Sequence, residues 1–380
     1  MKEITYEKLI ELPKDSYELI DIRDEGLTAY GMIPGAIHVY IEDLENSDAI
    51  SGIPREKKLV FYCEVGRRSL EIDDTLKCFD GRDCYSLSEG YSGYIRSVLK
   101  SDNDKKEKKK RAEESIQKKF HYKLFSPFAK ACKTYKLLEP NDHIAVCISG
   151  GKDSMLMAKL FQEIRRHGLF EFDLTFLVMD PGYNKENRAL IESNASALGI
   201  PITIFESRIF DAVDRIENSP CYLCARMRRG HLYKKAKDLG CNKIALGHHY
   251  DDVIETILMS MLQSAQIRTM MPKLRSLNFE GMELIRPLYL VRETDICAWR
   301  DYNDLHFLQC ACHFTDTCTT CHEDGTTSSK RLETKKLIAQ LKNTNPFVES
   351  NIFKSVENVS LDTVIEYKKN GVRHSFLEDY

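Results

Sequence analysis

Two cysteines lie beside a strongly basic segment of this 380-residue sequence. In NSPCYLCARMRRGHLYKKAKDLG, Cys221 and Cys224 are three positions apart, and arginines follow at 226, 228 and 229. A lone pair at this spacing fits a zinc site, redox chemistry, an iron–sulfur cluster or ordinary burial about equally well. Nearby positive charge favours the thiolate that binds metals, so the arginines agree with a metal site without identifying it.

A glycine loop follows the apolar stretch HIAVCI and precedes the helix-like stretch MLMAKL. Gly150 and Gly151 let the backbone approach a phosphate closely, while Lys152 and the amides of the following helix supply positive potential. The spacing is not that of a Walker A loop. An ordinary glycine-rich turn is the alternative, but the strand before and the helix after favour a phosphate site. The expected nucleotide-binding residues of this loop are Ser149, Gly150, Gly151, Lys152, Asp153 and Ser154, with Lys152 and Asp153 also catalytic.

A second polar segment, in KIALGHHYDDVIETILM, ends an expected strand at Gly247 and begins a helix. Asp251 and Asp252 are expected to hold Mg²⁺ on the phosphates, although acidic residues at a helix start also occur for capping alone. We assign His248, and Asp180 at the end of LTFLVMD, to the same nucleotide site.

A third reactive position is Cys63 in LVFYCEVGRRSLEIDDTL, which reads as a strand, a loop and a helix. A cysteine that opens such a loop faces backbone amides and a helix N-terminus, which favour a thiolate or persulfide anion. Arg67 and Arg68 add positive charge. We therefore expect Cys63 and Arg68 to be catalytic.

The elements that position these residues divide into two α/β units. Short apolar runs alternate with helix-like stretches in residues 1–99, and a larger α/β unit with a parallel sheet and a helical, cysteine-rich C-terminal part is expected over 120–380. Residues 100–119 are almost wholly charged and are expected to form a solvated linker, helical in its second half. An RNA-contacting arm is the alternative for this segment.

The composition is that of a soluble globular protein, with 42% hydrophobic and 30% charged residues. No secretory signal and no membrane-spanning run is expected, which predicts a cytoplasmic protein without a membrane partner, whose thiols stay reduced. The formal net charge is −3, so any RNA contact requires local basic patches. A homodimer is compatible with the sequence, which does not determine the oligomeric state.

The motifs SGGKDS, CYLCARMRRG, IALGHHYDD and IRPLYLVRETDI occur in this order over about 240 residues. Together they resemble the tRNA 2-thiocytidine synthetase (TtcA) family of PP-loop ATPases, whose fold is a doubly wound parallel sheet of the adenine nucleotide alpha hydrolase type. The resemblance implies cleavage of ATP to AMP and pyrophosphate, and replacement of oxygen by sulfur in an anticodon-loop cytidine of tRNA. It also implies a [4Fe–4S] cluster on Cys221, Cys224 and one later cysteine.

The later cysteine is expected in FLQCACHFTDTCTTCHEDG. Its position after LHFLQ favours Cys310, and the C-x-C arrangement places Cys312 within reach of the same role. The remaining pair, Cys318 and Cys321, is expected either in a separate zinc site with Cys312 or His322 or in a mobile loop.

The N-terminal segments LIDIRDEG and GMIPGAIHV, with the loop of Cys63, resemble the rhodanese (sulfurtransferase) domain. Asp21 and Arg23 match the structural pair of that family. The resemblance implies that Cys63 carries a persulfide loaded from an upstream donor such as a cysteine desulfurase or thiosulfate. An inactive regulatory rhodanese fold is the alternative.

The combined reading is a tRNA-cytidine 2-sulfurtransferase in which a rhodanese persulfide supplies the sulfur. Two other functions remain open. One is a PP-loop thiolase or desulfidase that acts on another nucleobase or RNA. The other is a redox-responsive iron–sulfur protein without catalysis, which would leave Lys152, Asp153 and Ser154 without a role.

Overall fold

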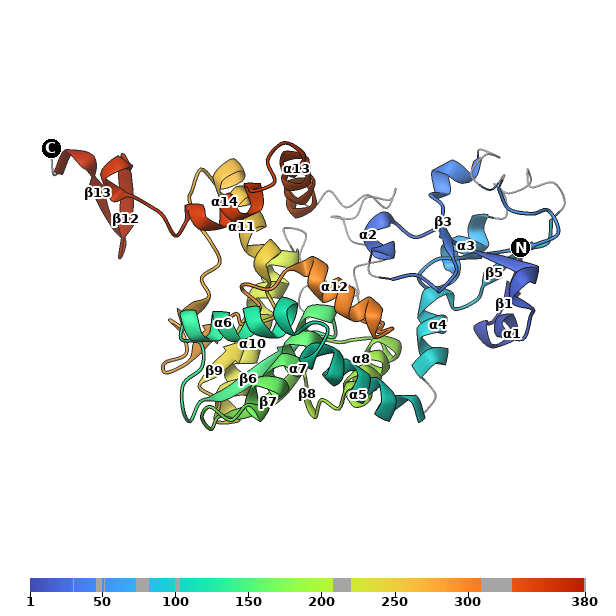
Figure 1. The fold of residues 1–380 in the computed structure, drawn as a ribbon, viewed down its shortest axis with the longest axis horizontal. Coiled ribbons are helices and arrows are strands. Elements are labelled where there is room, and N and C mark those ends of the chain that lie inside the picture. The colour runs from blue at the N-terminus through green and yellow to red at the C-terminus, as the bar shows by residue number, and fades with distance from the viewer. Residues whose placement is uncertain are drawn as a thin grey trace.

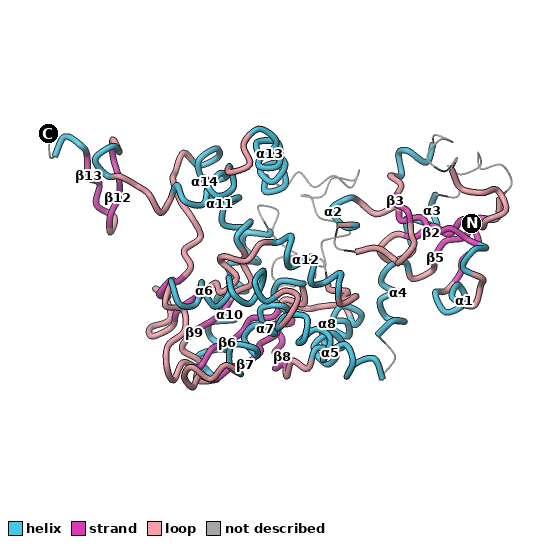
Figure 2. The backbone as a smooth tube through the Cα atoms, in the orientation of Figure 1, coloured by secondary structure: helices cyan, strands magenta, loops and turns pink. Residues whose placement is uncertain are grey.

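The computed structural model describes most of the chain, namely residues 1–29, 31–45, 50, 52–72, 82–99, 103–207, 220–308 and 330–378 (Figure 1). The side chains of residues 45, 99, 103–105 and 220–226 are not described. Two α/β units follow one another along the chain, as expected, and the N-terminal unit lies at one end of the molecule (Figure 2).

The N-terminal domain is built on a five-stranded parallel sheet with the strand order β1-β5-β4-β2-β3. Its strands are β1 (Lys2–Ile4), β2 (Tyr17–Asp21), β3 (Ile37–His38), β4 (Lys58–Tyr62) and β5 (Cys84–Leu87), and its helices are α1 (Tyr6–Ile10), α2 (Glu25–Thr28), α3 (Arg67–Glu71) and α4 (Gly90–Leu99). Successive residues of a strand point to opposite faces. Leu59 and Phe61 of β4 accordingly join one buried cluster, while Val60 and Tyr62 join another.

The larger domain contains a six-stranded sheet with the order β10-β11-β9-β6-β7-β8, parallel except for β10. Its strands are β6 (His143–Ile148), β7 (Asp173–Asp180), β8 (Ile202–Glu206), β9 (Lys243–Ala245), β10 (Lys273–Arg275) and β11 (Glu283–Ile285). The helices are α5 (Asn103–Gln117), α6 (Ser126–Thr134), α7 (Lys152–Arg166), α8 (Lys185–Leu198), α10 (Pro220–Asp238), α11 (Tyr250–Ser264), α12 (Glu293–Tyr302), α13 (Lys330–Thr344) and α14 (Val348–Ser355).

The order of this sheet reverses at β6, because β7 pairs on one side of it and β9 on the other. Doubly wound sheets bind ligands beyond the carboxyl ends of their strands at such a reversal. The expected doubly wound parallel sheet is therefore confirmed, and Ser149 immediately follows β6 at this edge.

The charged segment expected as a linker forms α5, and one face of this helix is buried. Ala112 and Ile116 are 0% and 1% exposed and belong to the core of the larger domain. Glu113 pairs with the buried Lys159 of α7 at 2.7 Å. The second half of α5 is thus fixed to the larger domain.

The C-terminal part is helical through α13 and α14, as expected, but it ends in a hairpin of β12 (Glu366–Lys369) and β13 (Val372–Ser375), which projects at one end of the molecule (Figure 1). Asn370 and Gly371 connect the two strands, with φ of 53° and 83°. Asn-Gly is the preferred pair for a two-residue hairpin turn, so the sequence contained this signal. Across the described ranges, no helix has both the length and the apolar character needed to cross a membrane.

Candidate active sites

The glycine loop is closed by hydrogen bonds among its serines. The Ser154 hydroxyl accepts from the Ser149 amide at 3.2 Å and donates to the Gly151 carbonyl at 2.9 Å. Gly150 has φ of +89°, and a Cβ there would lie 2.7 Å from Ile191, so only glycine fits this position. The loop directs the start of α7 toward the carboxyl edge of the sheet, which is the arrangement that binds phosphate groups.

Lys152, in the first turn of α7, is only 4% exposed. Its ammonium group donates to Asp153 Oδ2 at 3.3 Å and to Glu293 Oε1 at 3.1 Å. Burial alone would raise the pKa of Glu293, but Lys152 and Lys335 outweigh it and lower the pKa to about 2. The carboxylate of Glu293 therefore stays charged and holds the expected phosphate-binding lysine in place.

Asp153 presents one carboxylate oxygen toward the site. Burial raises its pKa despite the attraction of Lys152. Oδ1 is buried and accepts no hydrogen bond from the described residues, and His249 Nε2 lies 4.0 Å from it. A buried oxygen without a donor is the atom that a metal ion or ligand hydroxyl would satisfy.

The two aspartates at the start of α11 are engaged in the protein's own contacts. Asp251 accepts from the Glu293 amide at 2.7 Å and pairs with Arg292 at 2.9 Å. Asp252 caps the helix through the His249 amide and pairs with Arg331. The capping alternative thus describes Asp252, whereas Asp251 joins the start of α11 to the start of α12. In the parts of the chain that the structure describes, no three His, Cys, Asp or Glu side chains gather as a metal site.

Asp180 ends β7, next to the glycine loop's own strand in the sheet. Its Oδ1 accepts from the amides of Gly182 and Tyr183 at 2.9 and 2.7 Å, and Oδ2 pairs with Arg188 at 3.2 Å. Both oxygens therefore stabilise the turn after β7.

Gly247 and His248 follow β9 at the same edge, and Arg286 follows the neighbouring β11. Arg286 is 7% exposed and donates to the Met271 carbonyl, while its Nε finds no acceptor among the described residues. Burial, reinforced by Arg286, lowers the pKa of His248 to about 4, and burial lowers the pKa of Arg286 to about 10. No described carboxylate forms an ion pair with Arg286. Its positive charge at the carboxyl edge of the sheet is therefore suited to bind an anion.

Sequence reasoning missed Glu293 and Arg286, which complete the site. Both lie in IRPLYLVRETDI, a stretch that indicated a family resemblance and no role for its individual residues. Arg292 of the same stretch ties the start of α12 to α11 and α14 through Asp251 and Glu349. Only the fold shows that this stretch runs past Lys152.

The expected cluster ligands lie largely beyond what the structure describes. Cys221 and Cys224 are the second and fifth residues of α10, whose backbone is described there and whose side chains are not. Three residues apart on a helix, they share one face. Cys310, Cys312, Cys318 and Cys321 lie outside the described residues.

In the N-terminal domain, Cys63 follows β4 and is 4% exposed. Its sulfur lies 3.6 Å from the Ser69 hydroxyl, which in turn contacts Ser86 at 2.8 Å. Gly66 is the N-cap residue before α3, with φ of +85°, and a Cβ there would lie 2.6 Å from the Ser88 carbonyl oxygen. The loop is thus held tightly around the sulfur.

Asp21 and Arg23 form a buried ion pair at 2.7 Å, in line with the expected structural role. Arg23 also pairs with Glu64 at 3.1 Å. The negative charge of Glu64, which follows Cys63 in the sequence, is therefore paired with the guanidinium of Arg23. Arg68 is exposed on α3 and makes no ion pair with the described residues. It is therefore available to an anionic donor.

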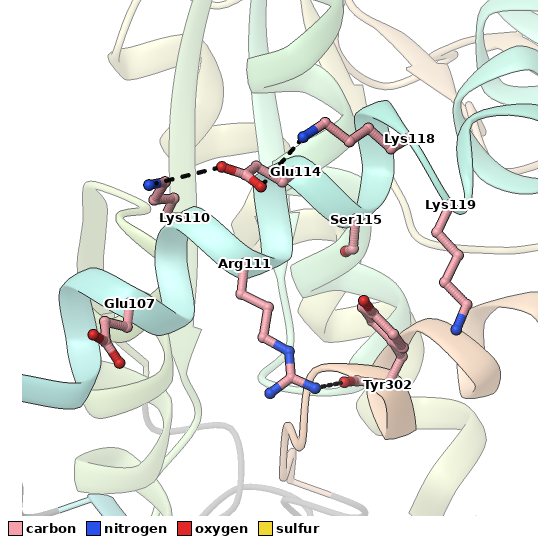
Figure 3. Close-up of a pocket in the computed structure, with 8 residues that line it drawn as sticks. All are labelled: Glu107, Lys110, Arg111, Glu114, Ser115, Lys118, Lys119 and Tyr302. Carbon is pink, nitrogen blue, oxygen red and sulfur yellow. Dashed lines mark hydrogen bonds and ion pairs between the residues drawn. The ribbon is translucent and has the colours of Figure 1, made fainter.

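The exposed face of α5 carries the basic residues that suggested an RNA-contacting arm (Figure 3). Lys119 lies 3.9 Å from the centre of the Tyr302 ring, and Arg111 lies 5.1 Å from it and donates to the Tyr302 carbonyl. Glu114 sits between Lys110 and Lys118 at 3.9 and 3.5 Å. These contacts keep the face ordered, and part of its charge is neutralised internally.

Comparison with known proteins supports both domains. Residues 106–312 match the family model of the PP-loop domain, and residues 5–97 match that of the rhodanese-like domain. The tRNA-cytidine(32) 2-sulfurtransferase of Coxiella burnetii (strain RSA 493 / Nine Mile phase I) is 33% identical over 257 residues, which cover 66% of this chain and 95% of that protein. The enzyme of the same name from Anaeromyxobacter dehalogenans (strain 2CP-C) is 32% identical over 240 residues, or 62% of this chain and 79% of that protein.

Among solved structures, the U34-tRNA thiolase NcsA from Methanococcus maripaludis with its [4Fe-4S] cluster aligns with a TM-score of 0.48 and 20% identity, over 62% of this chain and 79% of that chain.

Fold and site together define a PP-loop protein with an N-terminal rhodanese-like domain. The chain belongs to the tRNA-cytidine(32) 2-sulfurtransferase family and is a sulfurtransferase. Both family resemblances expected from the motifs are confirmed.

Proposed function

We propose that this protein uses ATP to replace oxygen by sulfur in a cytidine of tRNA, and that Cys63 of its own rhodanese-like domain relays the sulfur. The observation that carries the proposal is the glycine loop of Ser149–Ser154 with its buried Lys152, located at the order reversal of the sheet in a chain of this family. A sulfur relay on the same polypeptide accounts for the rhodanese-like domain.

In the first step, O2 of the cytosine attacks the α-phosphorus of ATP, and the bond to pyrophosphate breaks. Lys152 supplies the positive charge that stabilises the leaving pyrophosphate. Asp153 Oδ1, which lacks a donor among the described residues, is the best-placed carboxylate oxygen for the Mg²⁺ that accompanies ATP.

In the second step, sulfur bonds to C2 and the C–O bond breaks, so the oxygen leaves with AMP. The outer sulfur of a Cys63 persulfide is two electrons more oxidised than sulfide. Two thiols must therefore supply these electrons as they form a disulfide and release Cys63 as a thiol. The buried loop of Cys63 protects the persulfide from solvent until that exchange.

A [4Fe–4S] cluster fits the donor set of Cys221, Cys224 and Cys310 or Cys312. Cys221 and Cys224 are three positions apart near the start of α10, and thiolates are the ligands of such clusters. With three protein ligands, such a cluster would leave one iron open to bind hydrosulfide.

The experiment compares the parent protein with Cys63→Ser, using tRNA from a strain that lacks 2-thiocytidine. With ATP and a persulfide donor, the parent should form 2-thiocytidine, measured by mass spectrometry of the nucleosides, and Cys63→Ser should not. Cys63→Ser should recover when sulfide is supplied directly. Equal product from both proteins with the persulfide donor would eliminate the relay, and a different thiolated nucleoside would change the substrate.

A further inference from the structure

The rhodanese-like domain and the PP-loop domain meet at one histidine. His306 follows α12 in the PP-loop domain, and its ring lies between Tyr91 and Tyr94 of α4. The Tyr91 hydroxyl is 3.1 Å from His306 Nδ1, and the Tyr94 hydroxyl is 3.3 Å from Nε2. Asp304 Oδ1 is also 3.3 Å from Nε2. Both ring nitrogens therefore have partners, and the tyrosine hydroxyls belong to the other domain.

The surface around this histidine is closely packed. Tyr91 and Tyr94 are 4% and 3% exposed. Leu190 of α8 packs against the apolar cluster of the rhodanese-like domain that contains both tyrosines. The buried Arg300 of α12 donates to the Ala29 carbonyl at 3.1 Å. Both ring nitrogens of His306 have partners, and the two tyrosine rings are buried, so this contact fixes how the two domains are oriented.

On one side of this contact lies the loop of Cys63. The Tyr91 amide donates to the Cys63 carbonyl at 2.9 Å. The guanidinium of Arg23 lies 3.8 Å from the centre of the Tyr91 ring, and Arg23 also pairs with Glu64. The tyrosine that contacts His306 is thus part of the wall of the sulfur-carrying loop.

On the other side lies the glycine loop. The Leu308 amide donates to the Gly150 carbonyl at 3.2 Å. The His306 carbonyl accepts from Asn194 of α8 at 2.9 Å, which fixes the backbone between these two residues. Residues 306–308 therefore connect the two active loops, and Cys310 follows in the sequence two positions later, outside the described residues.

We infer that His306 is a positioning residue that docks the rhodanese-like domain on the PP-loop domain, so that sulfur passes between two loops held in one arrangement. The part of this inference that concerns sulfur rests on the proposed function. A flexible tether alone would give an effective concentration on the order of mM, and a docked pair exceeds this because orientation is also fixed.

The test removes only the two hydroxyls that reach His306, in Tyr91→Phe/Tyr94→Phe. This change leaves the histidine and the glycine loop intact. Two net hydrogen bonds correspond to a change of about tenfold or more in the docking equilibrium. Tyr85→Phe is the matched control, because Tyr85 lies in the same domain and its ring faces Lys2 and Lys58 of that domain.

Docking is measured on the full-length chain by small-angle X-ray scattering and by hydrogen exchange in α4 and α8. We expect the double variant to be more extended and to exchange faster in both helices, while Tyr85→Phe matches the parent. Scattering and exchange that are unchanged in the double variant would overturn the docking role, whatever the reaction of the enzyme proves to be.

Sulfur transfer is measured in the same proteins. Sulfur loaded on Cys63 is quantified first in each protein, and thiolation is compared per loaded Cys63. The double variant should thiolate tRNA normally with sulfide. Thiolation through the Cys63 persulfide should fall about tenfold or more. Parental persulfide-dependent thiolation in a protein shown to be undocked would overturn the positioning role. If the parent itself thiolates no tRNA, the proposed function fails, while the scattering and exchange results still decide the docking.

Discussion

At the scale of single residues, the centre of the PP-loop site is a charge balance rather than an isolated cation. Lys152 is buried between Asp153 and Glu293. Such a lysine keeps its position without a ligand, but its removal leaves two buried carboxylates with less compensation. Loss of function and loss of stability must therefore be separated when this residue is changed.

We predict that Lys152→Met abolishes ATP-dependent pyrophosphate release and lowers the free energy of unfolding by about 3–5 kcal/mol, because a buried pair loses one partner. Lys152→Met/Glu293→Gln restores much of the charge balance. Its thermal stability should recover most of the loss, while pyrophosphate release should stay absent. Pyrophosphate release that returns with stability would show that Lys152 acts only through folding.

At the scale of elements, α11 and α13 are joined through Arg331, which pairs with Asp252 and lies 3.5 Å from Glu255. Glu255 is 4% exposed, and burial raises its pKa to about 7 despite the nearby arginine. Between the ordinary pKa near 4.5 and 7, the unfolded chain loses the proton that the folded chain keeps. Stability therefore falls as the pH rises through this window, and the cost is complete above it.

Glu255→Gln should remove that titration. We expect its melting temperature to match the parent near the lower end of the window and to exceed it at pH 8, with a gain of up to about 3 kcal/mol in unfolding free energy. Glu333→Gln, at an exposed position on α13, is the matched control and should show no such gain. An equal gain at both pH values would mean that the effect is not a titration.

The start of α10 gives a second prediction at this scale. Cys221→Ala and Cys224→Ala should each lose the iron and sulfide of anaerobically reconstituted protein, measured chemically. Cys310→Ala should lose more than Cys312→Ala. The control is Cys241→Ala, at a core position that is 4% exposed, which should keep its iron. Full iron content in both α10 variants would remove the cluster from this helix.

At the scale of the whole molecule, the sequence predicts the order of strands and loops better than the contacts between distant segments. Buried strands such as HIAVCI and the glycine loop carry local signals, because periodicity and turn chemistry act over a few residues. The hydrogen bond from Lys152 to Glu293 joins residues 141 positions apart, and the contact of Tyr91 with His306 joins residues 215 positions apart. No local pattern encodes such pairs.

The same limit explains why α5 was expected as a solvated linker. Its charge dominates the composition, whereas its packing depends on a few small or apolar residues, Ala112 and Ile116 among them, that meet the larger domain only after folding. The pairing of Glu113 with Lys159 likewise appears only in three dimensions.

The strand orders also determine which of the two domains can fold first during synthesis. The sheet of the rhodanese-like domain is complete once β5 has been made, since β1 pairs with β5 at its edge. In the larger sheet, the central β6 can pair with β9 only after β9 has been synthesised. β9 in turn can pair with β11 only after synthesis has reached Ile285, where β11 ends. At roughly 5–20 residues per second, synthesis of the intervening chain takes on the order of 10–40 s. The rhodanese-like domain can therefore fold on the ribosome well before the surface on which it docks exists. During that interval the hydroxyls of Tyr91 and Tyr94 have no histidine to contact.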